Sequence, residues 1–311
     1  MKRIIFPMLL FVGLAYAATG LRAVYAAQGV SHDWGPEFQV NNTSGPASGV
    51  VGRGLVVDSQ NQLHATWTDR SSGKMRAYFA SSVDNGHTWS NAIDFSLSAL
   101  PAFGPNIAIG PDDILHVAWL DRIDAESRIY HSRSLDGGVS WETPKAVSAE
   151  SEIDAVAITI SVDTSKRVHL SWHAGNPNSE TEIAQVYYAR SLDNGKTFQE
   201  PLKLNTDADA HAAFPRFDVQ GSNGELVAVS WRDRRAGNWD IYVAVSTDAG
   251  ESFQEYFVYA APGARYDYDP EVIVDPNGVL HLAFFSNQRG GSVIIYQYST
   301  DLGQTWSKVK V

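Results

Sequence analysis

Apolar and polar residues alternate along most of the chain in short segments that recur in one order. A stretch such as LVVDSQNQ ends in a turn, a second such as LHATWTD follows, and a polar loop precedes a third such as RAYFASS. These segments are rich in β-branched and aromatic residues and are bounded by Gly, Pro, Asn and Asp, a pattern typical of antiparallel strands joined by hairpins. The pattern therefore predicts an all-β protein.

One turn, placed before a fourth short segment, occurs five times with the same spacing of Ser, Asp, Gly, Ser or Thr, and an aromatic residue. Its copies are SSVDNGHTWS (81–90), SRSLDGGVSW (132–141), ARSLDNGKTF (189–198), AVSTDAGESF (244–253) and QYSTDLGQTW (297–306). The five aspartates are Asp84, Asp136, Asp193, Asp248 and Asp301, so successive copies are 52, 57, 55 and 53 residues apart. Four strands per unit, repeated at this period, predict a β-propeller of four-stranded antiparallel blades.

The repeated aspartate suits a structural role. Its carboxylate can accept hydrogen bonds from backbone N–H groups further along the turn, the glycine supplies a positive φ, and the hydroxyl adds a local bond. The aromatic residue then returns to the sheet, where it can pack between blades. We therefore expect the five aspartates to stabilise turns and not to act in catalysis.

The five turns resemble the Asp-box, or bacterial neuraminidase repeat, of the sialidase superfamily, over residues 49–311. The resemblance implies a propeller with the boxes on the outer edges of the blades, away from the catalytic face. It leaves activity open, because Asp-box propellers include glycosidases, lyases, receptors and assembly factors. Five boxes predict five blades. A six-bladed ring like that of sialidases is the alternative, if further strands follow Val311.

The N-terminus has the pattern of a secretory signal. Lys2 and Arg3 precede an apolar run from Ile4 to about Tyr16, and small residues suited to signal peptidase follow. We expect residues 1–27 to be a signal peptide and 28–311 a single propeller domain, with no membrane span after cleavage. The chain has no cysteine, which favours a bacterial periplasmic or secreted protein without disulfides.

Composition narrows the class of partner. The chain is 44% hydrophobic and carries a net charge of -11, with a pI of about 5.2. A core of this size fits one globular domain, and the absence of a basic stripe makes nucleic acid an unsuitable partner. We expect a monomer whose partner is a glycan or an extracellular protein.

Three arginines follow the aspartate that ends a second strand, in the pairs Asp69-Arg70, Asp121-Arg122 and Asp233-Arg234. The resemblance to sialidases implies that Arg70, Arg122 and Arg234 bind a substrate carboxylate, for which guanidinium groups are suited. The alternative is that each pair fixes its own loop by a local ion pair.

The Phe/Tyr-Arg-Ile-Pro element that opens the first blade of sialidases is missing. Val51 stands at the arginine position, and Arg53 could replace it only with a change of register. Arg216, in the sequence Phe214-Pro215-Arg216, is a scrambled echo of this element and is a further candidate for substrate binding.

Catalytic candidates lie in two acidic segments. Tyr268 with Glu271 is the nearest match to the tyrosine and glutamate that sialidases use, and Asp269 and Asp209 could supply further carboxyl groups. Ordinary loop and strand roles are the alternative for all four residues. Trp239 lies outside the repeat pattern and is a candidate exposed platform for stacking a sugar.

No cofactor is required by this pattern. Asp207, Asp209 and His211 have alternate spacing that could place three ligands on one side of an extended segment, and calcium would accept the carboxylate oxygens, but a solvated loop is the favoured reading. Histidines recur at one position of the second strand, at His64, His116, His169 and His281. This recurrence indicates packing and not a metal cluster, and no metal site is assigned.

The sequence thus favours a secreted, sialidase-like propeller that binds a glycan or a protein partner through its loop face, with catalysis in doubt. One alternative is an exo-glycosidase of the sialidase type that removes terminal sugars. The other is a scaffold or assembly factor of an exported complex.

Overall fold

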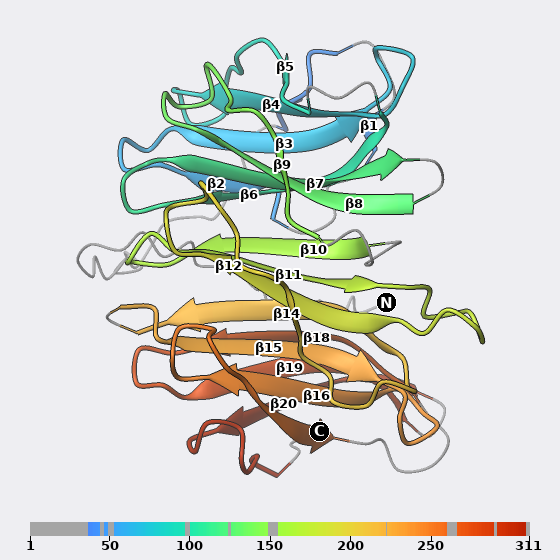
Figure 1. Cartoon of the computed structure of the whole chain (residues 1–311). Coiled ribbons are helices and arrows are strands. Elements are labelled where there is room, and N and C mark those ends of the chain that lie inside the picture. The colour runs from blue at the N-terminus through green and yellow to red at the C-terminus, as the bar shows by residue number, and fades with distance from the viewer. Residues whose placement is uncertain are drawn as a thin grey trace, which may run out of the picture.

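The chain folds into successive antiparallel sheets arranged as the blades of a propeller (Figure 1). The computed structural model describes residues 37–43, 47–48, 53–96, 100–123, 126–148, 155–221, 223–259, 266–288 and 291–308. The predicted signal peptide, residues 1–27, lies outside these ranges. In the described part every regular element is a strand, which confirms the all-β propeller.

Five blades follow one another along the chain. Blade 1 contains β1 (Ala47–Ser48), β2 (Leu55–Val57), β3 (Leu63–Asp69), β4 (Arg76–Ser82) and β5 (Ile93–Asp94). Blade 2 contains β6 (Ala102–Ile109), β7 (Leu115–Ile123), β8 (Glu126–Ser134) and β9 (Lys145–Ala146). Blade 3 contains β10 (Ala155–Val162), β11 (Val168–Ala174), β12 (Gln185–Ser191) and β13 (Leu202–Lys203).

Blade 4 contains β14 (Ala212–Gln220), β15 (Leu226–Asp233), β16 (Asp240–Ser246) and β17 (Gln254–Tyr259). Blade 5 contains β18 (Asp267–Val274), β19 (Leu280–Gln288) and β20 (Gly291–Ser299). In place of the fourth strand expected after Trp306, Ser307 bonds to β20: its N–H donates to the Tyr298 carbonyl at 2.8 Å, its carbonyl accepts the Gln297 amide at 2.8 Å and its hydroxyl accepts the Tyr298 N–H at 3.1 Å. Figure 1 shows blades 1, 2 and 3 in sequence order from the top, with the strands of blades 4 and 5 overlapping one another below them.

The core lies between adjacent blades. The middle of the second strand carries a large buried ring in every blade, and these rings are Trp67, Trp119, Trp172, Trp231 and Phe284. In blades 2 and 4 a buried aspartate two residues later accepts the indole N–H, at 2.9 Å for Asp121 and 3.2 Å for Asp233. Apolar residues on both faces of a sheet are expected where sheets stack face to face.

The repeated turns have the geometry expected of them. In the fourth copy, Asp248 accepts the Ser252 N–H at 2.9 Å and the Ser246 hydroxyl at 2.6 Å. The Ser246 hydroxyl in turn accepts the Gly250 N–H at 2.8 Å, and Gly250 has a φ of +82°. Although partial burial opposes the shift, the hydrogen bonds from Ser246 and Ser252 lower the pKa of Asp248 to about 2.

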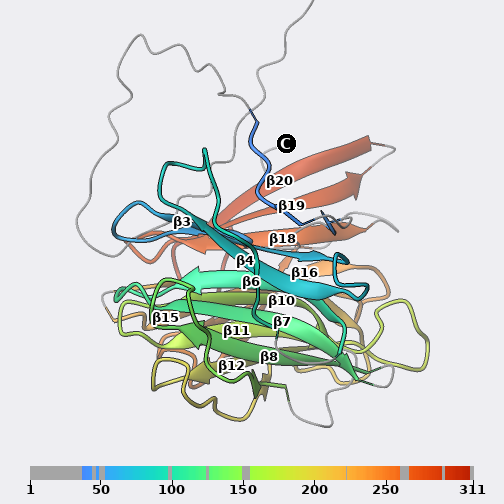
Figure 2. The same cartoon turned by 90° about the horizontal axis from the view of Figure 1, so that it is seen from above.

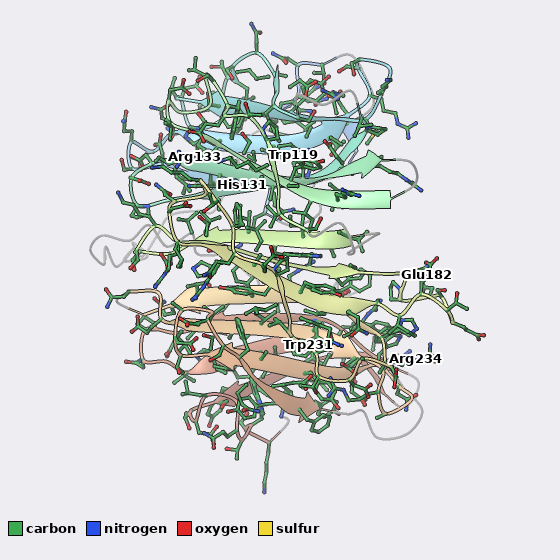
Figure 3. The ribbon with its side chains drawn as sticks, viewed as in Figure 1. Trp119, His131, Arg133, Glu182, Trp231 and Arg234 are labelled. Carbon is green, nitrogen blue, oxygen red and sulfur yellow. The ribbon has the colours of Figure 1, made fainter. Side chains whose placement is uncertain are left out.

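The two ends of the sheets differ. We call the loop face the end that carries the loops between second and third strands, including residues 70–75, 175–184 and 234–239. Figure 3 shows Glu182 and Arg234, from two of these loops, at the same end of the sheets, with His131 and Arg133 toward the opposite end. The repeated turns follow the third strands and therefore lie away from the loop face.

The residues near the N-terminus cover part of blade 1. Val40 packs against Trp67 and Tyr78, and the Phe38 ring lies 4.8 Å from the His87 ring. No helix in the described part of the chain is long and apolar enough to cross a membrane.

Candidate functional site

The inner strands share a bulge near the loop face. The register of β6, β10, β14 and β18 shifts after the second residue of each strand. The residue that follows has a positive φ in all four, 54° at Gly104, 54° at Ala157, 58° at Phe214 and 49° at Asp269. Left-handed backbone costs free energy for residues other than glycine, and bulges re-aim side chains beside active sites. This ring of bulges is therefore the first place to search for function.

The first residue paired again after each bulge occupies an equivalent position around the inner strands. This residue is Asn106, Thr159, Arg216 or Glu271, and Gly54 holds the same place in blade 1. Arg216 Nε lies 3.6 Å from Glu271 Oε2 across the contact between blades 4 and 5. The side chains are 28% and 58% exposed, so the pair is open to a ligand.

Other charged groups of the inner strands surround this pair. Partial desolvation by the surrounding strands raises the pKa of Glu271, with a smaller contribution from the negative charge of Asp218; Arg216 and Arg53 oppose the rise. Burial also raises the pKa of Asp218, again against Arg53. Arginine stays charged, so the site sets guanidinium groups beside two carboxyl groups whose pKa values are raised.

Arg53 belongs to this group, although in the sequence it could match the sialidase arginine only with a change of register. It immediately precedes Gly54, its N–H donates to Asn106 Oδ1 at 2.8 Å, and its carbonyl accepts the Ile107 N–H at 2.8 Å. Val51, expected at the arginine position of the sialidase element, lies outside the described residues. The structure thus holds the Arg53 backbone against blade 2, just before β2, and its charge acts on Asp218 and Glu271.

A second cationic side chain, Arg232, lies among aromatic rings. Its guanidinium carbon is 4.2 Å from the centre of the Phe214 ring, 4.6 Å from that of Trp239 and 5.0 Å from that of Tyr268. Burial lowers the pKa of Arg232, and Asp269 and Tyr268 oppose that shift. Aromatic faces stabilise a cation that has lost part of its hydration. The three rings therefore fix the guanidinium beside the bulges of β14 and β18.

His173 closes the group on the side of blade 3. Its ring centre lies 4.8 Å from that of Phe214, and its Nδ1 accepts the Phe214 N–H at 3.2 Å. Burial, with Arg232 and Arg216 nearby, lowers the pKa of His173 to about 3. The ring is therefore neutral and carries its proton on Nε2, which makes no hydrogen bond within the described structure. This N–H is a fixed donor beside the arginines.

We call these residues the bulge site: Arg53, His173, Phe214, Arg216, Asp218, Arg232, Trp239, Tyr268, Asp269 and Glu271. It brings together five of the residues that the sequence proposed, namely Arg216, Trp239, Tyr268, Asp269 and Glu271. Trp239 differs from its prediction, because it is only 7% exposed. The Trp239 ring packs against the Arg232 guanidinium and does not form an exposed platform for a sugar.

The other predicted residues lie elsewhere. Arg70 and Arg234 are exposed on loops and Arg122 is exposed near the end of β7, and no described contact joins the three arginines to Arg216 or Glu271. The predicted local ion pair is wrong for Arg234, because Asp233 pairs with Arg235 at 2.7 Å instead. The Arg235 guanidinium carbon also lies 4.1 Å from the Tyr242 ring centre. Arg235 thus takes the place beside Asp233, and the Arg234 side chain is exposed to solvent.

Asp209 is also apart from the bulge site. It is exposed, and its N–H donates to Asp207 Oδ1 at 2.9 Å in a local turn. His211 Nδ1 accepts the Ala184 N–H at 3.1 Å, so its ring is turned away from the two aspartates. In the described residues no three His, Asp or Glu side chains are grouped to hold a metal ion, which does not support the calcium alternative.

Buried carboxyl groups lie on the loop side of the bulge site. Asp240 is buried beside Asp233 and Asp267. Burial, together with the charges of Asp267 and Asp233, raises the pKa of Asp240 to about 6. The Asp267 N–H donates to the Trp239 carbonyl at 2.9 Å. This bond connects the three buried aspartates to Trp239, one of the rings around Arg232.

Sequence reasoning missed Arg232, His173 and Asp218. Arg232 is the only charged residue at the position directly after the large buried ring of the second strand, where the other blades have Thr68, Leu120, His173 and Phe285. This departure from the repeat was visible in the sequence and could have identified it. The bulges themselves left no comparable signal.

Comparison with known proteins agrees with the fold. The family model described as BNR repeat-like domain matches residues 129–311. A Dyadobacter fermentans protein of unknown function has a similar structure, with a TM-score of 0.60 and 15% identity over 85% of this chain and 82% of that chain. Comparison with curated protein sequences gave no match.

Two enzymes of known name have the same architecture. A Hadza microbial sialidase has a TM-score of 0.52 and 15% identity. The matched region covers 83% of this chain and 57% of the sialidase chain. An α-L-arabinanase of Penicillium chrysogenum, solved with arabinobiose, has a TM-score of 0.52 and 13% identity. The matched region covers 81% of this chain and 78% of the arabinanase chain. At these identities the likeness concerns the fold alone. The family match covers more than half of the sequence, and the chain belongs to the BNR repeat-like domain family.

Proposed function

We propose that the protein is an exported carbohydrate-binding propeller that takes an acidic sugar in the bulge site. The observation that supports this most is the gathering of Arg53, Arg216 and Arg232 beside carboxyl groups whose pKa values are raised. Guanidinium groups bind carboxylates and sulfates through paired, charge-assisted hydrogen bonds. A ligand carboxylate would replace the weak contact between Arg216 and Glu271.

The neighbouring groups suit a sugar ring. Tyr268 offers an aromatic face and a hydroxyl beside the arginines, so that polar and apolar surfaces converge as sugar sites require. The solved propellers with this fold include a sialidase and an arabinanase with arabinobiose. Both names concern carbohydrates, which favours a glycan over a protein partner.

Hydrolysis of a glycoside is the second candidate. Glu271 favours it, because a carboxyl group with a raised pKa that remains open to a ligand can act as a general acid. Tyr268, which precedes the same bulge, and Asp269, which lies in it, are the candidates for the opposing group. A binding protein needs none of these protonation properties, so turnover separates the two functions.

Isothermal titration with a panel of oligosaccharides tests the proposal. The panel contains sialic acid, glucuronate and sulfated sugars, with neutral sugars of equal length. Acidic sugars should bind, and Arg216→Ala and Arg232→Ala should each weaken binding at least tenfold, about 1.4 kcal/mol. Lys203→Ala, on the outer strand β13, is the control. Turnover of fluorogenic glycosides that is lost in Glu271→Gln would establish the hydrolase. A blank panel would favour the assembly factor.

A further inference from the structure

Arg216 and Glu271 neutralise each other in the free protein. Arg216 Nη1 donates to the carbonyl of the preceding residue, Pro215, at 3.0 Å, and Arg216 Nε faces Glu271 Oε2 at 3.6 Å. Within the described structure, Glu271 makes no other hydrogen bond or ion pair. An acidic ligand that binds Arg216 therefore takes from Glu271 its one direct contact with a cation.

The other two carboxyl groups of the bulge site are held differently. Asp218 Oδ2 accepts the Val274 N–H at 2.9 Å, so a backbone donor of blade 5 stabilises its charge. Asp269 lies near Arg232, where its charge opposes the fall in the pKa of that arginine. Neither group depends on Arg216. Among the three carboxyl groups, Glu271 is the one that a ligand on Arg216 leaves without a directly contacting partner.

The charges of the bulge site balance when its carboxyl groups are ionised. Three guanidinium groups stand with three carboxylates, and these residues are Arg53, Arg216, Arg232, Asp218, Asp269 and Glu271. His173 adds no charge, because burial lowers its pKa to about 3. A carboxylate or sulfate of a ligand brings a fourth negative charge, so the complex has an excess of one. Uptake of one proton by a carboxylate restores the balance.

The surroundings of Glu271 favour it as the group that takes the proton. Its strand, β18, packs against β14 and β15 of blade 4, and in Figure 2 it lies between β19 and β20 of its own blade and the sheets of the other blades. Partial desolvation there raises the pKa of Glu271, and the charge of Asp218 adds to the rise. Arg216 and Arg53 oppose it. A ligand that occupies Arg216 weakens this opposition and adds a further negative charge, and both changes raise the pKa of Glu271 again.

We propose that the bulge site takes up one proton when it binds its acidic sugar, and that Glu271 carries this proton in the complex. The inference rests on the proposed function, because it needs an anionic ligand on Arg216. The proton comes from solvent, to which the Glu271 side chain is 58% exposed, and no covalent bond of the ligand is made or broken. Protonation changes Glu271 from a competitor for Arg216 into an O–H donor that a ligand oxygen can accept.

The affinity for an acidic sugar then depends on pH in one direction. The pKa of Glu271 is higher in the complex than in the free protein, where it already lies above the ordinary glutamate value of 4.5. Affinity is greatest below the pKa of the free protein, because Glu271 is protonated there before the ligand arrives. It falls as the pH rises through the interval between the two pKa values, and it is lowest above both. The site thus holds acidic sugars more tightly in acidic surroundings.

Isothermal titration calorimetry measures the proton uptake directly. The protein is titrated with a glucuronate-terminated oligosaccharide and with a sulfated counterpart, whose charge is constant over the range, at pH values from about 5 to about 8. Each titration is repeated in two phosphate-free buffers of different ionisation enthalpy, because the difference between the observed enthalpies gives the number of protons bound. We expect a net uptake of up to about one proton per sugar, and an affinity that falls by about three- to tenfold across this range.

Two isosteric variants assign the proton. Glu271→Gln should bind without proton uptake and with an affinity that does not change with pH, whereas Glu182→Gln, exposed on the loop face, should behave as the unchanged protein. Binding without uptake, uptake that persists in Glu271→Gln, or weaker binding by that variant at pH 7 would overturn the proposal and leave the acidic-sugar site in place. Absence of binding to either sugar at every pH would overturn the proposed function, and this proposal with it.

Discussion

Arg216 and Glu271 follow matching bulges on neighbouring inner strands, and Arg216 Nε lies 3.6 Å from Glu271 Oε2. At this separation the pair is an ion pair without a short hydrogen bond, in a place where both side chains are partly open. An exposed ion pair of this kind adds little to stability. Ligand binding explains its position better, because a polar group of a sugar can replace either side chain as the partner of the other.

Replacing Glu271 by glutamine should strengthen the binding of an acidic sugar. The substitution removes the negative charge that competes with the ligand for Arg216 and keeps the size of the side chain. We expect an increase of about three- to tenfold at pH 7, close to the energy of one partly screened charge pair. Titration calorimetry measures it. If Glu271→Gln binds more weakly than the unchanged protein, Glu271 contacts the ligand directly as a hydrogen-bond acceptor.

The stability of the fold should depend on pH through Asp240. Its pKa is raised from 3.8 to about 6 by burial and by Asp267 and Asp233. The folded state therefore holds a proton that the unfolded state has released, and stability is lost as the pH rises from about 4 to 6.

Asp240→Asn should consequently be more stable than the unchanged protein at pH 7.5, by about 1 to 3 kcal/mol, and nearly equal to it at pH 4. Urea denaturation at the two pH values measures the difference. A gain of the same size at both pH values would show that the amide improves packing and that titration of Asp240 is not involved.

The repeated turn should contribute stability and leave binding unchanged. Asp248→Ala removes the bonds from the Ser252 N–H and from the hydroxyls of Ser246 and Ser252. We expect a loss of about 1 to 2 kcal/mol in the free energy of unfolding. Thr247→Ala, in the same turn, is the control and should cost less. A loss of glycan affinity in Asp248→Ala with unchanged stability would contradict the structural role.

Two glycines separate the cost of backbone strain from that of contact between blades. Gly250 and Gly73 have φ values of +82° and +84°, but a Cβ meets Tyr188 only at Gly250 and nothing within 4 Å at Gly73. Gly73→Ala should cost about 1 kcal/mol for strain alone, and Gly250→Ala should cost about 2 kcal/mol more because Tyr188 must move. Thermal denaturation compares them. Equal losses would mean that the turn does not press on the neighbouring blade.

The fold could be predicted from the sequence because it is repeated. Five copies of one turn report the strand order of each blade, and alternation of apolar residues gives the register of strands such as β11 and β15. The site was harder, because it depends on bulges that shift the register by local backbone strain. Arg216 and Glu271 were proposed on separate grounds, and only the bulges bring their side chains together. Trp239 was predicted to be exposed because a loop sequence does not reveal that Arg232 lies over its ring.

The most direct test of the account compares two sugars that differ only in charge. Isothermal titration with a glucuronate-terminated oligosaccharide and its glucose-terminated counterpart isolates the contribution of one carboxylate to binding. The acidic sugar should bind at least tenfold more tightly, about 1.4 kcal/mol, and Arg232→Ala should remove most of this preference. Equal affinities for the two sugars, or a preference that survives in both Arg216→Ala and Arg232→Ala, would contradict an acidic-sugar site at the bulges.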